Sequence, residues 1–126
     1  MGAASVAAGA FGAHGLKSML EASGQAANWE TASRYALVHA MTLLATGLFA
    51  ALPGAKHLSG VLAGAAVCFG VGTVIFSGCL WILAVTGIRV LGAVVPIGGG
   101  LLIAGWLLLA LGGARLADDS GVGSGH

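Results

Sequence analysis

Apolar residues fall into four long stretches separated by short polar connections. The first covers Met1–Ala13, the second Thr31–Leu52, the third about Leu58–Val85 and the fourth about Leu91–Leu111. The last three are long enough to cross a lipid bilayer as α-helices, which takes about 20 mostly apolar residues. The pattern therefore predicts an all-α fold, a polytopic membrane bundle of four transmembrane helices.

The first stretch differs from the others in length. At about 1.5 Å per residue it covers only about 20 Å, less than the roughly 30 Å thickness of a hydrocarbon core. We therefore expect its helix to be short or truncated. Either the natural chain begins further upstream, or the helix continues through His14 and Gly15 as far as Leu20.

The connections indicate which helices are neighbours. Residues Leu16–Asn28 are polar and predict a segment at the membrane interface, whereas Pro53 and Gly54 end the second helix just before the third begins. The second and third helices should thus form an antiparallel hairpin. We assign residues 1–113 to a single four-helix transmembrane domain and residues 114–126 to a polar, flexible tail, whose last residues, Gly123–His126, resemble the start of an expression tag.

Composition supports the membrane assignment. The mean hydropathy is +1.00, 58% of residues are hydrophobic and only 7% are charged, whereas soluble domains carry about 25% charged residues. The expected partner is the lipid bilayer, and we expect no soluble domain beside the spans. The formal net charge of +1 provides no basic patch, so no nucleic-acid partner is expected.

A polar stripe interrupts the second apolar stretch. Its members recur at steps of four, four, three and four residues, which places them on one side of an α-helix. They are Thr31, Tyr35, His39, Thr42 and Thr46. Because lipid offers these side chains no hydrogen-bond partner, we expect the stripe to face the interior of the bundle or a cavity.

Two histidines are the candidates for a ligand or proton site. His14 follows the first apolar stretch and His39 lies inside the second, so the pair could bind haem axially, bind a metal or pass protons. In the other interpretation, His39 forms a hydrogen bond with Tyr35 or a backbone carbonyl and fixes helix packing. No Cys or His spacing typical of zinc accompanies them, so the sequence predicts no metal and no cofactor.

Small residues mark two further features. In the third stretch they recur at every fourth position, which predicts a groove for another helix; they are Gly60, Gly64, Cys68 and Gly72. The fourth stretch contains Pro96 followed by Gly98, Gly99 and Gly100. These residues predict a kinked start, with Pro96 directed inward because irregular backbone in a membrane must be covered.

Four segments, in their order and spacing, resemble the DUF423 family of small membrane proteins, whose animal relatives are called transmembrane protein 256. They are GAFGAHGLK (Gly9–Lys17), WETASRYALVHA (Trp29–Ala40), FSGCLWILAVTG (Phe76–Gly87) and PIGGGLLIAGW (Pro96–Trp106). The resemblance implies a bundle of about four transmembrane helices and almost nothing about activity. Family members usually carry more apolar residues before the first segment, and this sequence departs from the family there.

The sequence does not predict an enzyme. No nucleophile stands beside a base, and the glycines at 98–100 lack the strand and lysine of a phosphate-binding loop, so no catalytic residue is expected. The favoured interpretation is a structural or accessory protein that joins copies of itself or a larger membrane complex. The alternative is a small oligomeric transporter or channel with a polar path lined by the second and fourth helices. Either should be a multi-pass protein of the bacterial inner (plasma) membrane.

Overall fold

A computed structural model describes residues 1–122 of the chain, with side chains as far as Asp118, and this part is almost entirely helical. The elements in chain order are α1 (Gly2–Ala13), α2 (Lys17–Ala22), α3 (Ala26–Ala50), the 3₁₀ helix η1 (Pro53–Leu58), α4 (Ser59–Thr86) and α5 (Val90–Val122). Within the described residues there is no strand, so the predicted all-α class is confirmed.

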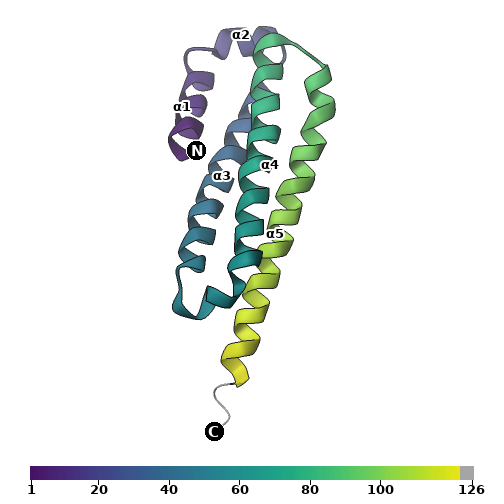
Figure 1. The fold of residues 1–126 in the computed structure, drawn as a ribbon. Helices are drawn as coiled ribbons and strands as arrows, with labels where there is room; N and C mark the ends of the chain where they lie inside the picture. The colour runs from purple at the N-terminus through teal and green to yellow at the C-terminus, as the bar shows by residue number, and fades with distance from the viewer. Residues whose placement is uncertain (123–126) are drawn as a thin grey trace.

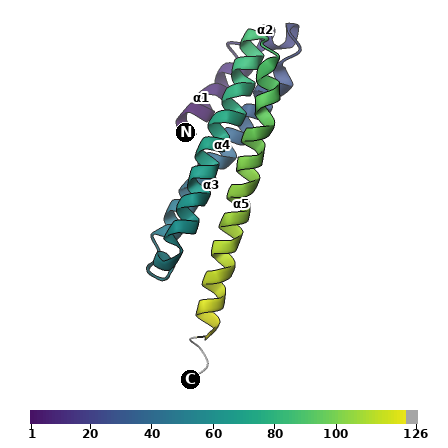
Figure 2. The ribbon, with the colours of Figure 1, turned by 45° about the vertical axis from the view of Figure 1, so that its right-hand side comes forward.

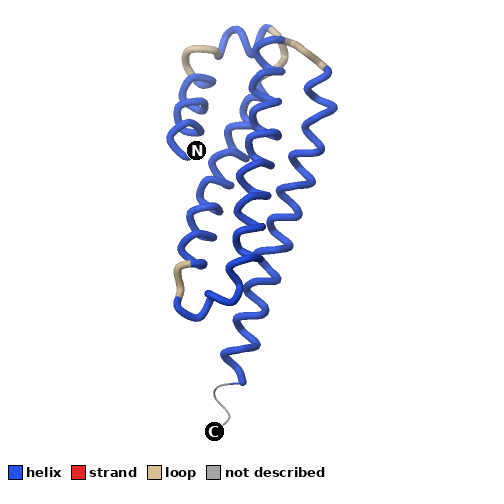
Figure 3. The backbone as a smooth tube through the Cα atoms, in the orientation of Figure 1, coloured by secondary structure: helices blue, strands red, loops and turns tan. Residues whose placement is uncertain are grey.

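The helices lie side by side in the order α1, α3, α4 and α5, and α2 lies at one end (Figure 1). Helix α4 is central and packs against both α3 and α5. Helix α1 packs on α3 and reaches along only part of its length (Figures 1 and 2). The connections are short (Figure 3); the α4–α5 turn begins at Gly87, whose φ of 71° is readily adopted only by glycine.

Two helical segments of the described chain are long and apolar enough to cross a membrane, Pro53–Thr86 and Val90–Asp118. Helix α3 is as long as a span, with 25 residues, but Arg34 and His39 lower its hydropathy. Helix α1 is apolar and has only 12 residues. The count of four spans thus remains a prediction.

The first helix ends at Ala13 and does not continue to Leu20. The backbone N–H of Leu16 donates to the carbonyl of Phe11 at 2.8 Å, which closes the helix in a turn. Residues from Lys17 then form the separate helix α2. The predicted interfacial segment is therefore a short helix and two turns at one end of the molecule (Figure 1).

Helices α4 and α5 meet along a seam in which residues of α4 rest on glycines of α5, through a side chain at Gly105 and Gly112 and through the backbone at Gly98. The glycines recur every seven residues, and so do their partners; the pairs are Leu62 with Gly112, Phe69 with Gly105 and Phe76 with Gly98. A seven-residue period keeps contacts on one side of a helix, because seven residues fall only about 20° short of two turns. The seam can therefore run the length of the pair.

The predicted small-residue groove contributes to this seam at two of its four positions. A Cβ added at Gly72 would lie 2.9 Å from the Leu102 side chain, and one at Gly64 would lie 3.5 Å from Leu108. Gly60 faces open space and Cys68 is half-buried. Residues spaced four apart rotate by about 40° around the helix axis at each step, because four residues exceed one turn. A series with this spacing therefore leaves the side of α4 that faces α5, whereas a series with a spacing of seven stays on it.

The structure corrects the expectation that Pro96 points inward. Pro96 lies inside the unbroken helix α5 and is exposed. Gly98, which lies about 200° further around the helix, is the buried residue and faces α4. Of its neighbours, Gly99 lies near Phe76, since a Cβ added there would be 3.7 Å from the Phe76 ring, and Gly100 faces open space.

Helix α5 also runs further than expected, through residues 114–122 of the segment that the sequence assigns to a flexible tail. Arg115, Leu116 and Ala117 are good helix formers, and Leu116 packs against a cluster of Ala55, Leu58 and Leu62. This contact explains why the helix continues beyond its apolar stretch. The expected tag residues Gly123–His126 lie outside the described residues.

Candidate functional site

His39 lies where α3, α4 and α5 come together, and its side chain is only 4% exposed. Its Nδ1 lies 2.8 Å from the backbone carbonyl oxygen of Tyr35, one turn earlier on α3. Its Nε2 lies 3.3 Å from the indole nitrogen of Trp106 on α5. The imidazole therefore links two helices that have few backbone contacts with each other.

The two partners determine the protonation of the ring. An indole N–H can only donate, so Nε2 of His39 must accept, whereas a carbonyl oxygen can only accept, so Nδ1 must carry the proton and donate. Both requirements are met by one neutral tautomer. In this tautomer neither nitrogen has a lone pair free for a haem iron or another metal.

Aromatic rings surround this imidazole. The rings of Tyr35, Phe69 and Trp106 have centroids 5.9, 5.7 and 6.3 Å from that of His39. Phe69 and Trp106 meet edge to face at 5.4 Å, and Tyr35 stacks on Phe76 at 4.6 Å. Aromatic pairs in these arrangements stabilise a fold beyond the area that they bury. The cluster thus fixes the position of His39 from three helices.

The remaining polar-stripe residues follow α3 in both directions from His39. Thr42 and Thr46 are buried, and their hydroxyls donate to the carbonyls of Val38 and Thr42, one turn earlier. Thr31 is half-buried and Tyr35 is 42% exposed. The hydroxyls of Thr42 and Thr46 are thus satisfied within α3 itself, a common solution for polar side chains inside a membrane bundle.

A cavity of about 300 Å³ lies beside His39. Its walls come from α3, α4 and α5 and comprise Tyr35, His39, Phe76, Gly99, Leu102, Ile103 and Trp106. Most of these side chains are apolar, and the two nitrogens of His39 are already hydrogen-bonded. The cavity is suited to an apolar group more than to an ion.

His14 and His39 are not brought together. His14 is exposed at the end of α1, whereas His39 lies about 20 Å along α3 from its first residue. Within residues 1–122 no group of three or more His, Cys, Asp or Glu side chains could hold a metal ion. Cys68 and Cys79 are free thiols.

Sequence reasoning did not identify Trp106 and Phe69 as partners of His39. The seven-residue series on α4 and α5 was a usable signal. It places Phe69 and Gly105 on the α4–α5 seam, and Trp106 follows Gly105 in the sequence. Sequence reasoning also did not identify Trp29 as a contact between helices. Its indole N–H donates to the carbonyl of Ala8 at 2.8 Å and so attaches α1 to α3.

Comparison with known proteins identifies the family of the chain. Residues 8–99 match the family model described as "Protein of unknown function (DUF423)", which confirms the resemblance of the four segments. The chain is 45% identical over 107 residues to a UPF0382 membrane protein of Staphylococcus saprophyticus, with 85% of this chain and 84% of that protein covered. It is 38% identical over 110 residues to the UPF0382 membrane protein YwdK of Bacillus subtilis, with 84% and 83% covered. No solved structure matches the chain.

Proposed function

Because the chain belongs to the DUF423 family, with relatives that are named membrane proteins, we propose a multi-pass protein of the bacterial plasma membrane with a structural or accessory role. In this proposal its four helices α1, α3, α4 and α5 cross the bilayer, α1 being the short one. It joins copies of itself or a larger membrane complex and performs no catalysis.

The distribution of side chains around α3 supports its assignment as a span. Its polar residues His39, Thr42 and Thr46 are buried, and its exposed positions include Met41 and Leu44. At about 1.5 Å per residue its 25 residues extend over about 37 Å, enough for a hydrocarbon core of about 30 Å. An α-helix with a polar side toward protein and an apolar side outward is what a lipid environment requires.

The bonding of His39 is the observation that carries the structural role. A residue that binds a coupling ion or relays protons needs a ring nitrogen that can exchange its partner with water or substrate. Here each nitrogen is engaged within the protein, one by Tyr35 and one by Trp106. This arrangement favours helix packing as the use of the imidazole.

Replacement of His39 by leucine tests the proposal in two measurements. We expect His39→Leu to lower the midpoint of unfolding in a denaturing-detergent titration, and proteoliposomes of the original chain to pass protons and potassium no faster than protein-free vesicles. His14→Leu is the matched control, since His14 is exposed at a helix end. Flux that changes in His39→Leu while the unfolding midpoint stays the same would overturn the structural role.

Transport remains the second candidate because of the cavity of about 300 Å³ beside His39, which lies between α3 and α5, the helices expected to line a path. The same flux measurement decides between the two. The association part is tested separately, by the size of the complex that a mild detergent extracts from the native membrane. A particle no heavier than one 12.2 kDa chain with its detergent would contradict it.

A further inference from the structure

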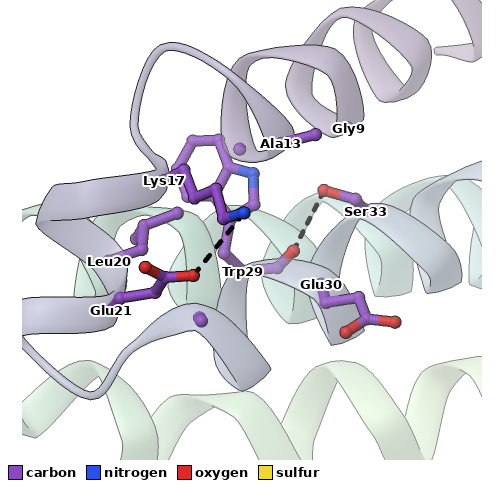
Figure 4. Close-up of a pocket in the computed structure, with 10 residues that line it drawn as sticks. Gly9, Ala13, Lys17, Leu20, Glu21, Trp29, Glu30 and Ser33 are labelled. Atoms are coloured by element: carbon purple, nitrogen blue, oxygen red, sulfur yellow. Dashed lines mark hydrogen bonds and ion pairs between the residues drawn. The ribbon is translucent and has the colours of Figure 1, made fainter.

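A second pocket, of about 390 Å³, lies at the other side of α3, where α1, α2 and the start of α3 meet. Gly9 and Ala13 of α1 form one wall, and the side chains of Lys17, Trp29 and Glu30 also line the pocket (Figure 4). Apolar and charged surfaces thus meet within one pocket. None of these residues belongs to the site around His39.

The walls of this pocket are held in place by contacts elsewhere. The indole N–H of Trp29 donates to the Ala8 carbonyl at 2.8 Å, and its ring lies 6.2 Å from that of Trp81. Ser33 donates to the Trp29 carbonyl and accepts from the indole N–H of Trp81. The pocket therefore exists without a ligand, and a ligand need not order its aromatic wall.

The charged groups around the pocket balance each other. Lys17 pairs with Glu21 at 4.0 Å, and Glu30 pairs with Arg34. All four side chains are more than half exposed, and exposed ion pairs of this kind contribute little to stability. Each partner therefore remains able to bind a ligand of opposite charge. Of these four residues, Lys17, Glu21 and Glu30 line the pocket. A lining that offers both signs of charge favours a ligand that carries one charge of each sign.

We propose that this pocket binds a zwitterionic phospholipid with a primary amine, such as phosphatidylethanolamine. Lys17 takes the phosphate, Glu30 takes the ammonium group, and the acyl region leaves along the small residues Gly9 and Ala13 of α1. The proposal goes beyond the structural role of the chain, and its failure leaves the site around His39 untouched.

Phosphatidylethanolamine fits the pocket better than phosphatidylcholine or phosphatidylglycerol does. A primary ammonium offers three N–H donors to the Glu30 carboxylate, whereas the quaternary amine of phosphatidylcholine offers none. Phosphatidylglycerol carries the same phosphate without an amine, so it gains the attraction of Lys17 but has no cation to offset the repulsion of Glu21 and Glu30. Phosphatidylethanolamine alone of the three satisfies both ends of the pocket.

The test is a lipid titration of the detergent-solubilised full chain followed by native mass spectrometry. Phosphatidylethanolamine, phosphatidylcholine and phosphatidylglycerol with the same acyl chains are compared, and free phosphoethanolamine is added as a competitor. We expect phosphatidylethanolamine to bind about tenfold more tightly than the other two, the ratio expected for one charge-assisted hydrogen bond. Free phosphoethanolamine should displace it weakly, because the acyl region contributes to binding.

Two variants remove the preference by different routes. Gly9→Leu fills the pocket, since a Cβ at Gly9 meets nothing within 4 Å, and Glu30→Gln removes an exposed carboxylate that the fold does not need. Their matched controls are Gly100→Leu, at an equally open glycine of α5, and Asp118→Asn, at an exposed carboxylate near the end of α5. Both controls should keep the preference.

Three results would overturn the assignment. The first is equal binding of the three lipids by the original chain, and the second is a preference that survives both Gly9→Leu and Glu30→Gln. The third is displacement of the lipid by free phosphoethanolamine at equal concentration, which would show that a soluble headgroup is the ligand and a lipid is not.

Discussion

The α4–α5 seam at Gly98 and the α1–α3 contact at Gly12 both place a glycine against a larger residue, but they differ in what opposes the glycine. At Gly98 an added Cβ would lie 2.5 Å from the backbone nitrogen of Phe76, which cannot step aside within a packed helix. At Gly12 it would lie 2.2 Å from the indole nitrogen of Trp29, the end of a side chain that can rotate. The first contact fixes two backbones, and the second depends on one ring.

The two contacts also differ in extent. In the seam, a glycine of α5 also packs closely against α4 at Gly105 and at Gly112, seven and fourteen residues after Gly98. Helix α1 has only 12 residues, and its side-chain hydrogen bond to α3 is the one from Trp29 to the Ala8 carbonyl. We infer that α3, α4 and α5 form the stable unit and that α1 is the peripheral helix, which can separate locally.

Gly98→Ala should have the largest effect. Its Cβ would also come within 2.9 Å of the Gly72 carbonyl oxygen, so α4 and α5 must move apart, and overpacking of this kind costs about 3 kcal/mol. The free energy of unfolding in a denaturing-detergent titration measures the change. Gly100→Ala, two residues away in open space, is the control and should be neutral or stabilise by about 0.5–1 kcal/mol. If Gly98→Ala and Gly100→Ala changed the free energy of unfolding equally, close packing at Gly98 would not be what stabilises the α4–α5 pair.

Trp106→Phe should have an intermediate effect. It keeps an aromatic ring against Phe69 and removes the N–H that His39 accepts. Combined with His39→Leu in a double-mutant cycle, it should give a coupling energy of about 0.6–1.7 kcal/mol, the range for hydrogen bonds between membrane helices. Trp81→Phe, which loses a bond to Ser33 only, should show no coupling with His39→Leu. Additive effects of Trp106→Phe and His39→Leu would exclude a direct bond.

Gly12→Ala should have the smallest effect on the whole molecule. The added methyl group pushes the Trp29 indole away from the Ala8 carbonyl, which costs about 0.6 kcal/mol in a membrane protein. Hydrogen exchange should become faster in α1 and remain unchanged in α4 and α5. Gly9→Ala, at an open position of the same helix, should leave the exchange of α1 unchanged. Faster exchange in all helices would show that α1 belongs to the stable unit.

Much of the fold follows from the apolar periodicity of the sequence. The helical class, the short first helix and the short connection around Pro53 are all visible in the residue pattern. The three- and four-residue steps from Tyr35 to Thr46 place His39, Thr42 and Thr46 on one side of α3, where all three are buried, whereas Tyr35 is 42% exposed. Such local periodicity is readable because it depends only on the geometry of one helix.

Contacts between helices were harder to predict. The orientation of Pro96 depends on which side of α5 meets α4, and the glycine series at 98, 105 and 112 decides that. The partner of His39 is Trp106, distant in sequence, and no pattern within α3 could indicate it. The pocket beside Trp29 depends on the turn that separates α1 from α2. These features arise only when segments far apart in the chain are placed together.

The most direct test of the account is the protonation of His39 in the bilayer. Solid-state NMR of the ¹⁵N-labelled chain in lipid vesicles measures the two ring nitrogens separately, and His39→Leu identifies their signals. The account predicts a protonated Nδ1 and an unprotonated Nε2 that couples to the indole N–H of Trp106, as their bonding to Tyr35 and Trp106 requires. An imidazolium ring, the opposite tautomer or rapid exchange of the ring proton with deuterated water would contradict it.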